Sequence, residues 1–264
     1  MSIWTNTTFD GPDVHIEYDY TCKECGKTFH SAMDVPDFAA DIIPRPTLCD
    51  QCGERLKQEA EKREKEARYR TLSVEAGIPV GFLDYDKSRG NTALFSAMKK
   101  NWNKSMFIIG PYDTGKSRAL AYCLTRWIIA DKGLSTQFYN WTRLCELYVA
   151  KAAEGMVKAN DFKLDLLDTD ILAIDDFGKR RPTPVMEDLT YELINGVYES
   201  GKRLWMTSNK PLRDVLQVYE NRDIAEAVIS RFDRMIRDGT MVKITATAIN
   251  GQKSPRTNKK GKDG

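Results

Sequence analysis

One segment, residues 110–117, constrains the fold of this chain more than any other. Gly110 is separated by four residues from Gly115, and Lys116 and Ser117 follow directly. An apolar run at residues 106–109 precedes it and predicts a buried strand, while residues 116–130 have helical spacing. A glycine-rich turn between a strand and a helix surrounds one point with backbone N–H groups, which favours bound phosphate. The segment therefore predicts a P-loop that binds a nucleoside triphosphate.

The individual loop residues have separate expected roles. Lys116 is expected to reach the β- and γ-phosphates of ATP, and the Ser117 hydroxyl to bind Mg²⁺. Asp113 is unusual, because its negative charge is expected to weaken ATP binding unless the side chain points away, although Asp tolerates positive φ better than most residues. The predicted cofactor-binding loop is Gly110, Pro111, Tyr112, Asp113, Thr114, Gly115, Lys116 and Ser117.

An acidic pair follows a second apolar run. Residues 171–174 read Ile-Leu-Ala-Ile and lead into Asp175 and Asp176, which is the form of a Walker B motif. We expect Asp175 to hold Mg²⁺ and Asp176 to orient or deprotonate the attacking water. Asn209 ends a later apolar run and is expected to contact the γ-phosphate or that water. The alternative interpretation of Asn209 is an ordinary turn before Pro211.

Strand and helix patterns alternate through this part of the chain. Apolar runs predict strands at residues 106–109, 136–139, 171–174, 204–207 and 241–244. Helical spacing predicts helices at residues 116–130, 141–152, 184–199 and 224–237. Such alternation predicts an α/β fold with a five-stranded parallel sheet covered on both faces.

Four cysteines near the N-terminus form two pairs, Cys22 with Cys25 and Cys49 with Cys52. Four thiolates at this spacing fit a tetrahedral structural Zn²⁺ site, with an iron–sulfur cluster as the alternative. A glycine follows each pair and is expected to form a tight turn around the metal. The region is poor in apolar residues, so we expect it to need the metal to fold.

Composition divides the chain into four parts. We predict a zinc-binding domain at residues 1–53, a solvated charged helical linker at 54–76, an ATPase domain at 77–250 and a disordered basic tail at 251–264. No long apolar run and no basic-then-apolar N-terminus is present, so we expect a cytoplasmic protein. Cys123 and Cys145 fall in predicted helices and are expected to be buried packing residues.

Together these motifs resemble the DnaC/IstB-like family of AAA+ ATPases over residues 69–256. The resemblance rests on residues 76–79, the P-loop, and residues 174–178, 191–195, 207–209 and 230–235. It implies an AAA+ core in which Asn209 is sensor 1 and Arg256 senses nucleotide. It also implies that Arg231 or Arg234 is an arginine finger given to a neighbouring copy. The alternative for both arginines is surface ion pairing with Asp233 or Asp238.

A cysteine-rich region ahead of this core resembles a helicase loader more than a transposition helper. The resemblance implies an ATP-dependent protein that binds a replicative hexameric helicase, single-stranded DNA and further copies of itself. The basic turn at residues 179–181 is a candidate contact for a DNA backbone, or a solvated turn. Two alternatives stay open: an IstB-like transposition helper that acts on duplex DNA, and an adaptor whose ATP site is weakened by Asp113.

Overall fold

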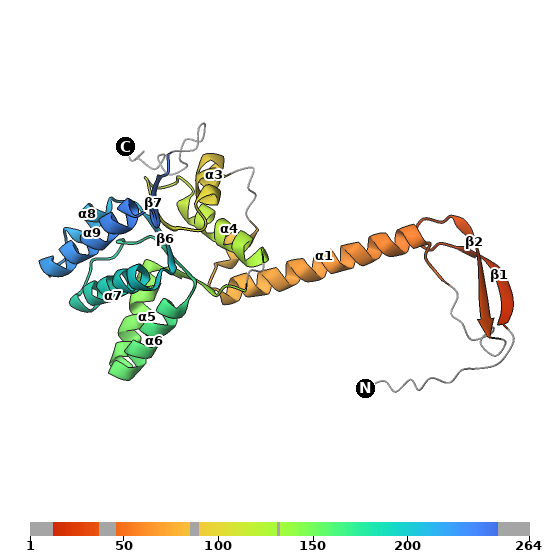
Figure 1. Ribbon diagram of the computed structural model, residues 1–264, viewed down its shortest axis with the longest axis horizontal. Coiled ribbons are helices and arrows are strands. Elements are labelled where there is room, and N and C mark those ends of the chain that lie inside the picture. Colours follow the sequence, from red (N-terminus) through yellow and green to blue (C-terminus); the bar gives the residue numbers. More distant parts are fainter. Residues whose placement is uncertain (1–12, 37–45, 85–89, 131–132, 248–264) are drawn as a thin grey trace, which may run out of the picture. The chain divides into compact units, whose positions relative to one another are not determined.

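The computed structural model describes residues 13–36, 46–84, 90–130 and 133–247 (Figure 1). The chain separates into two compact units, Met1–Ala67 and Arg68–Gly264. The tail predicted at residues 251–264, which includes Arg256, lies outside the described residues. None of the described helices combines the length and the apolar character needed to cross a lipid bilayer.

The first unit contains an antiparallel hairpin that the sequence did not predict. Strand β1 (Asp13–Thr21) pairs with β2 (Thr28–Pro36), and alternate residues along both strands are more buried. Two cross-strand pairs join the polar face: His15 Nδ1 lies 2.6 Å from Asp34 Oδ1, and His30 Nδ1 lies 3.0 Å from Asp19 Oδ1. Both histidines are therefore engaged within the hairpin.

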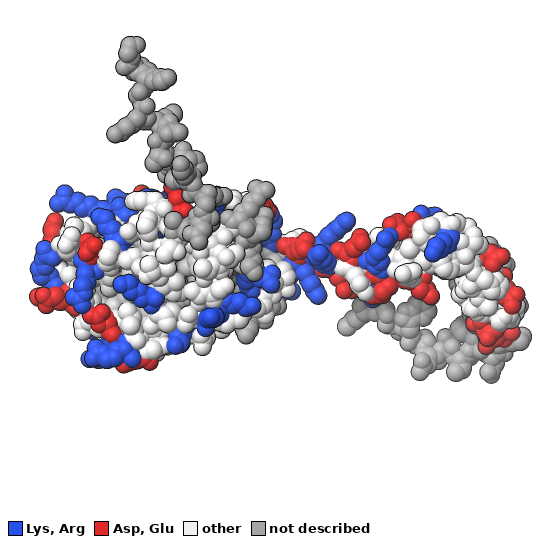
Figure 2. Space-filling model, turned by 90° about the horizontal axis from the view of Figure 1, so that it is seen from above, with Lys and Arg blue, Asp and Glu red and all other residues white. Residues whose placement is uncertain are grey.

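Helix α1 (Asp50–Glu75) is longer than the predicted charged linker and begins four residues earlier. Gly53 consequently lies in its first turn, with its N–H bonded to Cys49 O at 2.8 Å, so the tight turn expected at this glycine is wrong. Gly26, at φ 69°, does form the turn expected of it. Lys and Arg alternate with Asp and Glu along α1 (Figure 2), which suits a solvated helix stabilised by pairs one turn apart.

The second unit is built on a five-stranded parallel sheet, as predicted. The strands follow the order β4-β5-β6-β3-β7, and every neighbouring pair is parallel. Each strand lies where the apolar runs placed it. The bounds are β3 (Ser105–Ile109), β4 (Thr136–Asn140), β5 (Ile171–Asp175), β6 (Arg203–Ser208) and β7 (Met241–Thr245).

Helices cover both faces of this sheet (Figure 1). Met106 and Ile108 of β3 pack with α3 (Thr92–Lys100) and α4 (Lys116–Ile129). Phe107 and Ile109, which point the other way along the same strand, pack in a second core. Its helices are α5 (Trp141–Glu154), α6 (Met156–Asp168), α7 (Pro184–Ser200), α8 (Leu212–Leu216) and α9 (Arg222–Arg237). Cys123 and Cys145 are buried in these two cores, as expected.

Four helices have no counterpart in the sequence predictions: α2 (Val80–Leu83), α3, α6 and α8. Three of them have nine residues or fewer, a length at which a helix depends on tertiary packing more than on its own propensity. The long α7 ends as its sequence indicates, with Pro184 in the first turn and Gly201 at φ 67° beyond the last.

Candidate nucleotide-binding site

The P-loop connects β3 to α4, and its backbone has the conformation that an anion cradle requires. Gly115 lies at φ 80° and Asp113 at φ 62°, so the loop demands positive φ at a position that Asp occupies. Gly110 has no room for a side chain, because a Cβ there would lie 2.3 Å from Ala246 O of the chain beyond β7. The loop is therefore held tightly between β3 and the segment that follows β7.

Lys116 is buried and turned onto its own loop. Its Nζ donates to Gly110 O at 2.8 Å and to Pro111 O at 2.6 Å. Burial lowers the pKa of Lys116, and the negative charges of Asp176, Asp175 and Asp113 oppose that shift. An ammonium group with three carboxylates around it lies where the phosphates of a bound nucleotide are expected.

Asp175 and the P-loop helix meet because of the strand order. β6 alone separates β5 from β3, so the carboxyl ends of all three strands lie at one edge of the sheet. Burial raises the pKa of Asp175, while hydrogen bonds from Thr207 and Ser117 oppose the shift. The Ser117 hydroxyl and the Asp175 carboxylate thus lie together, and such oxygen donors fit Mg²⁺.

Asp176 is held in the left-handed region at φ 60°. Its Oδ2 lies 2.6 Å from Lys179 Nζ, and its Oδ1 accepts a hydrogen bond of 3.4 Å from Asn209 Nδ2. Asn209 therefore lies beside the second acid of the Walker B motif. Lys179 belongs to the basic turn at residues 179–181, and Arg180 of the same turn pairs with Glu146 at 3.4 Å. Two of the three cations in this turn are thus engaged within the chain.

Thr207, at the end of β6, links the two acids, and sequence reasoning gave it no role. Its fully buried Oγ1 donates to Asp175 Oδ1 at 2.6 Å and accepts from the Asp176 backbone N–H at 3.0 Å. The signals in the sequence are the two polar residues that end this apolar strand and the place of Thr207 in segment 207–209, which contributes to the family resemblance. Thr207 orients one acid by its side chain and the other by its backbone.

We expect Thr207→Val to lower the free energy of unfolding by about 1–3 kcal/mol. The substitution keeps the shape of the side chain but leaves a buried carboxylate and a backbone N–H without their shared partner. Denaturant titration of the nucleotide-free protein measures the loss. The matched control is Thr142→Val on α5, since that side chain has no bond to either acid; an equal loss in both variants would contradict the role of Thr207.

Asn91 is a second residue that the sequence did not reveal. Its Oδ1 caps α3 by accepting from Leu94 N at 3.0 Å. Its Nδ2 donates to Thr114 O of the P-loop at 3.2 Å and to Thr247 O at 3.0 Å. One buried amide therefore joins the P-loop, the start of α3 and the chain that follows β7.

The two candidate arginine fingers lie on α9 and differ in how firmly they are held. Arg231 is half-buried; its Nε donates to Asn195 Oδ1, and its Nη2 donates to Tyr191 Oη at 3.3 Å. Arg234 is exposed, and its Nη1 donates to Tyr198 Oη at 3.2 Å. The alternative prediction is that these arginines form surface ion pairs. It is wrong for the pair with Asp233, because Asp233 pairs with Arg213 instead, at 2.8 Å.

The four cysteines of the first unit come together as the spacing predicts. Their sulfur atoms all lie within 4.8 Å of one another, and Cys25 Sγ lies 3.9 Å from Cys49 Sγ. Four thiolates around one Zn²⁺ at about 2.3 Å are separated by roughly 3.8 Å, so the cluster fits a tetrahedral metal. Cys22 leaves the end of β1, whereas Cys52 lies in the first turn of α1. Phe29 and Leu48 pack against the cluster.

The fold and the site together define a P-loop nucleotide-binding protein with an AAA+ core. Within that class the chain belongs to the family of IstB-like ATP binding proteins, whose family model matches residues 79–257. The matched range contains the P-loop, the Walker B acids and α9. No curated protein matches the chain.

Solved structures provide distant likenesses. The chain is 14% identical to DnaI, with a TM-score of 0.52, and the match covers 64% of this chain and 94% of that one. The DnaC helicase loader is 18% identical to this chain, with a TM-score of 0.46, and the match covers 59% of this chain and 87% of that one. AMPPCP-bound DnaA from Aquifex aeolicus is 14% identical to this chain, with a TM-score of 0.45. The match covers 60% of this chain and 45% of that one. The chain thus spans less than half of that DnaA structure, and the likeness to DnaI supports the fold.

Proposed function

We propose that this protein is an ATPase that loads a replicative hexameric helicase onto single-stranded DNA. The observation that carries the proposal is the continuous polar network of the site, which runs from Ser117 through Asp175 and Thr207 to Asp176 and Asn209. A protein that only binds ATP needs the P-loop. The second acid and its partners have a use only if the nucleotide is hydrolysed.

Each residue of the network has a role in this proposal. The P-loop amides and Lys116 bind the phosphates, which replace the loop carbonyls as the partners of Nζ. Ser117 and Asp175 would hold Mg²⁺, which would supply positive charge to the phosphate oxygens. Asp176 accepts the proton of the attacking water, and Asn209 orients that water beside it. Lys179 must release Asp176 Oδ2 first, which supports slow turnover that a partner or DNA stimulates.

Of the two candidate fingers we propose Arg234. Arg231 is already engaged by Asn195 and Tyr191 and stabilises the packing of α9 against α7. Arg234 is exposed with one tyrosine partner, so its guanidinium is free to move to a γ-phosphate on another copy. This assignment requires a homo-oligomer formed through the ATPase unit.

The helicase and DNA enter the proposal through the rest of the chain. A metal-bound cysteine unit, with Zn²⁺ in the tetrahedral cluster, gives the protein a second folded surface on which a partner protein docks. Arg181, the exposed last cation of the turn after β5, offers a contact to a single-stranded DNA backbone, and such a contact weakens as salt is added. Two experiments test this: the purified protein should retain the host's replicative helicase on a column, and single-stranded DNA should raise its ATPase rate. Retention of a transposase instead, or stimulation by duplex DNA alone, contradicts the loader.

Asp176→Asn should lower the ATPase rate constant by about 10²-fold or more while ATP binding persists. The amide keeps the size of the side chain and the contact with Asn209, but it cannot take a proton. Steady-state phosphate release measures the rate, and a fluorescent ATP analogue measures binding. Asp188→Asn, at an exposed position of α7, is the matched control. A variant that hydrolyses ATP at the wild-type rate would falsify the role of Asp176.

The family supports one alternative, a transposition helper, since the matching model is described as IstB-like. The partner that the protein retains and the DNA form that stimulates it separate the two functions. An adaptor with a weakened ATP site is supported by Asp113, whose charge lies close enough to influence Lys116. The absence of any stimulated turnover in the wild-type protein would favour the adaptor.

Asp113→Gly should bind ATP more tightly than the wild type, by about tenfold if the charge difference is worth 1.4 kcal/mol. The glycine removes a negative charge from an anion-binding loop and adopts the same positive φ without strain. Calorimetric titration with a slowly hydrolysed ATP analogue gives both affinities. Asp113→Asn, which removes the charge and tolerates positive φ, separates the two contributions. Unchanged affinity in both variants would show that the carboxylate points away from the phosphates.

A further inference from the structure

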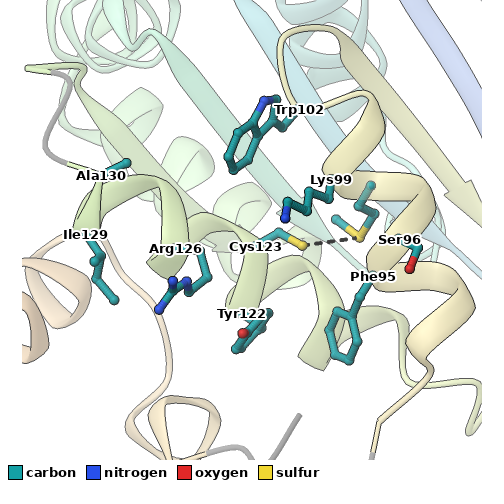
Figure 3. A pocket seen from close by; sticks show the side chains of 10 residues that line it. Phe95, Ser96, Lys99, Trp102, Tyr122, Cys123, Arg126, Ile129 and Ala130 are labelled. Atoms are coloured by element: carbon teal, nitrogen blue, oxygen red, sulfur yellow. Dashed lines mark hydrogen bonds between the residues drawn. The ribbon is translucent and has the colours of Figure 1, made fainter. Parts of the chain in front are cut away.

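A pocket of about 310 Å³ opens between α3 and α4 (Figure 3). These two helices cover the sheet face opposite α7 and α9. The pocket walls are Phe95, Lys99 and Trp102 on one side and Tyr122 and Arg126 on the other. Arg126 lies ten residues beyond Lys116 on α4, so about 15 Å of helix separates it from the P-loop. The pocket is therefore distinct from the nucleotide site.

The charged residues that line this pocket in the described part of the chain are both cations, Lys99 and Arg126. Neither α3 nor α4 contains an Asp or a Glu, although the chain has 38 of them. Lys99 and Arg126 are exposed, and neither is paired with a carboxylate in the described part of the chain. Both side chains line the pocket, Lys99 from α3 and Arg126 from α4 (Figure 3). Anions are consequently attracted to its rim from both sides.

The interior of the pocket is apolar and adaptable. Met98 is fully buried, and its sulfur lies 3.9 Å from Cys123 Sγ across the floor. Ile129 and Ala130 close one end, and Phe95 contacts Tyr122 with ring centroids 5.0 Å apart. Thioether and aromatic groups accommodate apolar side chains of different shapes.

The same rings argue against a stacked nucleobase as the occupant. Phe95 and Tyr122 are tilted by 58° to each other, and the Trp102 ring meets that of Trp127 edge-on at 82°. Stacking along a single strand needs ring faces that are open and parallel to successive bases. These rings instead pack against their neighbours and line a hole, which suits a side chain inserted from outside.

We propose that this pocket docks an acidic segment of a partner protein, with one large apolar side chain inserted between α3 and α4. Asp or Glu residues beside that anchor pair with Lys99 and Arg126 at the rim, and the anchor covers Met98 and Cys123. The arrangement is an apolar core with a charged rim, as in peptide-binding grooves. The site does not depend on ATP hydrolysis and is separate from the function proposed above.

A phage-displayed library of short random peptides, selected on the full-length protein, tests this proposal. The selected peptides should carry an aromatic or large aliphatic residue next to Asp or Glu. Lys99→Glu combined with Arg126→Glu should weaken their binding by about tenfold or more, because two charge pairs become repulsive. Ser96→Trp, which blocks the mouth of the pocket and changes no charge, should do the same. Lys158→Glu, an exposed reversal on α6, should leave binding unchanged.

Three outcomes would overturn the proposal. The first is a library that yields no peptides, or only basic ones. The second is peptides that bind the double reversal and Ser96→Trp as well as they bind the wild type. The third is oligo(dT) that binds the wild type, loses affinity on both pocket variants and competes with the peptides, which would make the pocket a nucleic-acid site. ATP binding and melting temperature of each variant confirm that it is folded.

Discussion

Arg234→Ala is expected to lower the ATPase rate of the assembled protein by about 10³-fold or more, the usual effect of removing an arginine finger. In the proposed role the guanidinium stabilises charge that develops on the γ-phosphate in the transition state, so the loss should fall on the rate constant rather than on ATP binding. Arg231→Ala, in contrast, removes bonds to Asn195 and Tyr191 within one subunit. It is expected to cost about 1–3 kcal/mol of stability with a far smaller effect on rate.

Mixing two inactive variants tests whether Arg234 acts on a neighbouring copy. Arg234→Ala subunits have an intact site and no finger, whereas Asp176→Asn subunits have a finger and no base. Mixed assemblies should regain activity at the interfaces where an intact site meets an intact finger. Mixtures of Arg234→Ala with the double variant Arg234→Ala/Asp176→Asn provide the control and should stay inactive. Recovery with Arg231→Ala subunits but not with Arg234→Ala subunits would reverse the assignment.

Removing the metal should unfold the first unit and leave the second intact. Among its described residues, the buried cluster consists of Cys22, Cys49 and Cys52, with Phe29 and Leu48 packed against them. Structural Zn²⁺ in small cysteine sites contributes about 10–16 kcal/mol of apparent binding free energy. Cys52→Ser, or a chelator, should therefore open residues 13–67 to proteases. Limited proteolysis with mass spectrometry locates the cuts, and metal analysis counts the ion.

Cys123→Ser is the control for this experiment, because that cysteine belongs to the second unit and is not one of the four clustered cysteines. It should retain one equivalent of zinc and an intact first unit. Equimolar iron and sulfide in the wild-type protein, in place of zinc, would support the iron–sulfur cluster as the occupant of the cysteine site. If the purified protein contains no metal and its first unit still resists proteases, the prediction of a structural metal site is wrong.

The ATPase fold could be predicted because its signals are local. Each strand of the sheet is a short apolar run, and the P-loop and Walker B motifs follow two of those runs directly. The hairpin β1–β2 escaped prediction because its exposed face carries polar residues that pair across the two strands, such as His15 with Asp34. This pair joins residues 19 positions apart and leaves no local pattern.

The site residues likewise divide into those that a local motif reveals and those whose role depends on the arrangement of the strands. Lys116, Asp175 and Asp176 stand in motifs that a single strand end presents, so their positions could be predicted. Thr207 and Asn91 act across the sheet edge, and their roles depend on which strands are neighbours. The spacing of motifs along the chain does not determine that β6 lies between β5 and β3. The role of Lys179 could not be predicted either, because its ion pair with Asp176 depends on the turn that Gly178 allows at φ 78°.

The positive φ of Asp113 and of Asp176 has a consequence for anyone who engineers this protein. Glycine at either position is expected to relieve backbone strain on the order of 1 kcal/mol. At position 113 the change also removes a negative charge from the proposed phosphate cradle. At position 176 it deletes the proposed proton acceptor together with its contacts to Lys179 and Asn209. A screen for heat resistance alone does not report these effects on the site, so each round must be paired with a turnover assay.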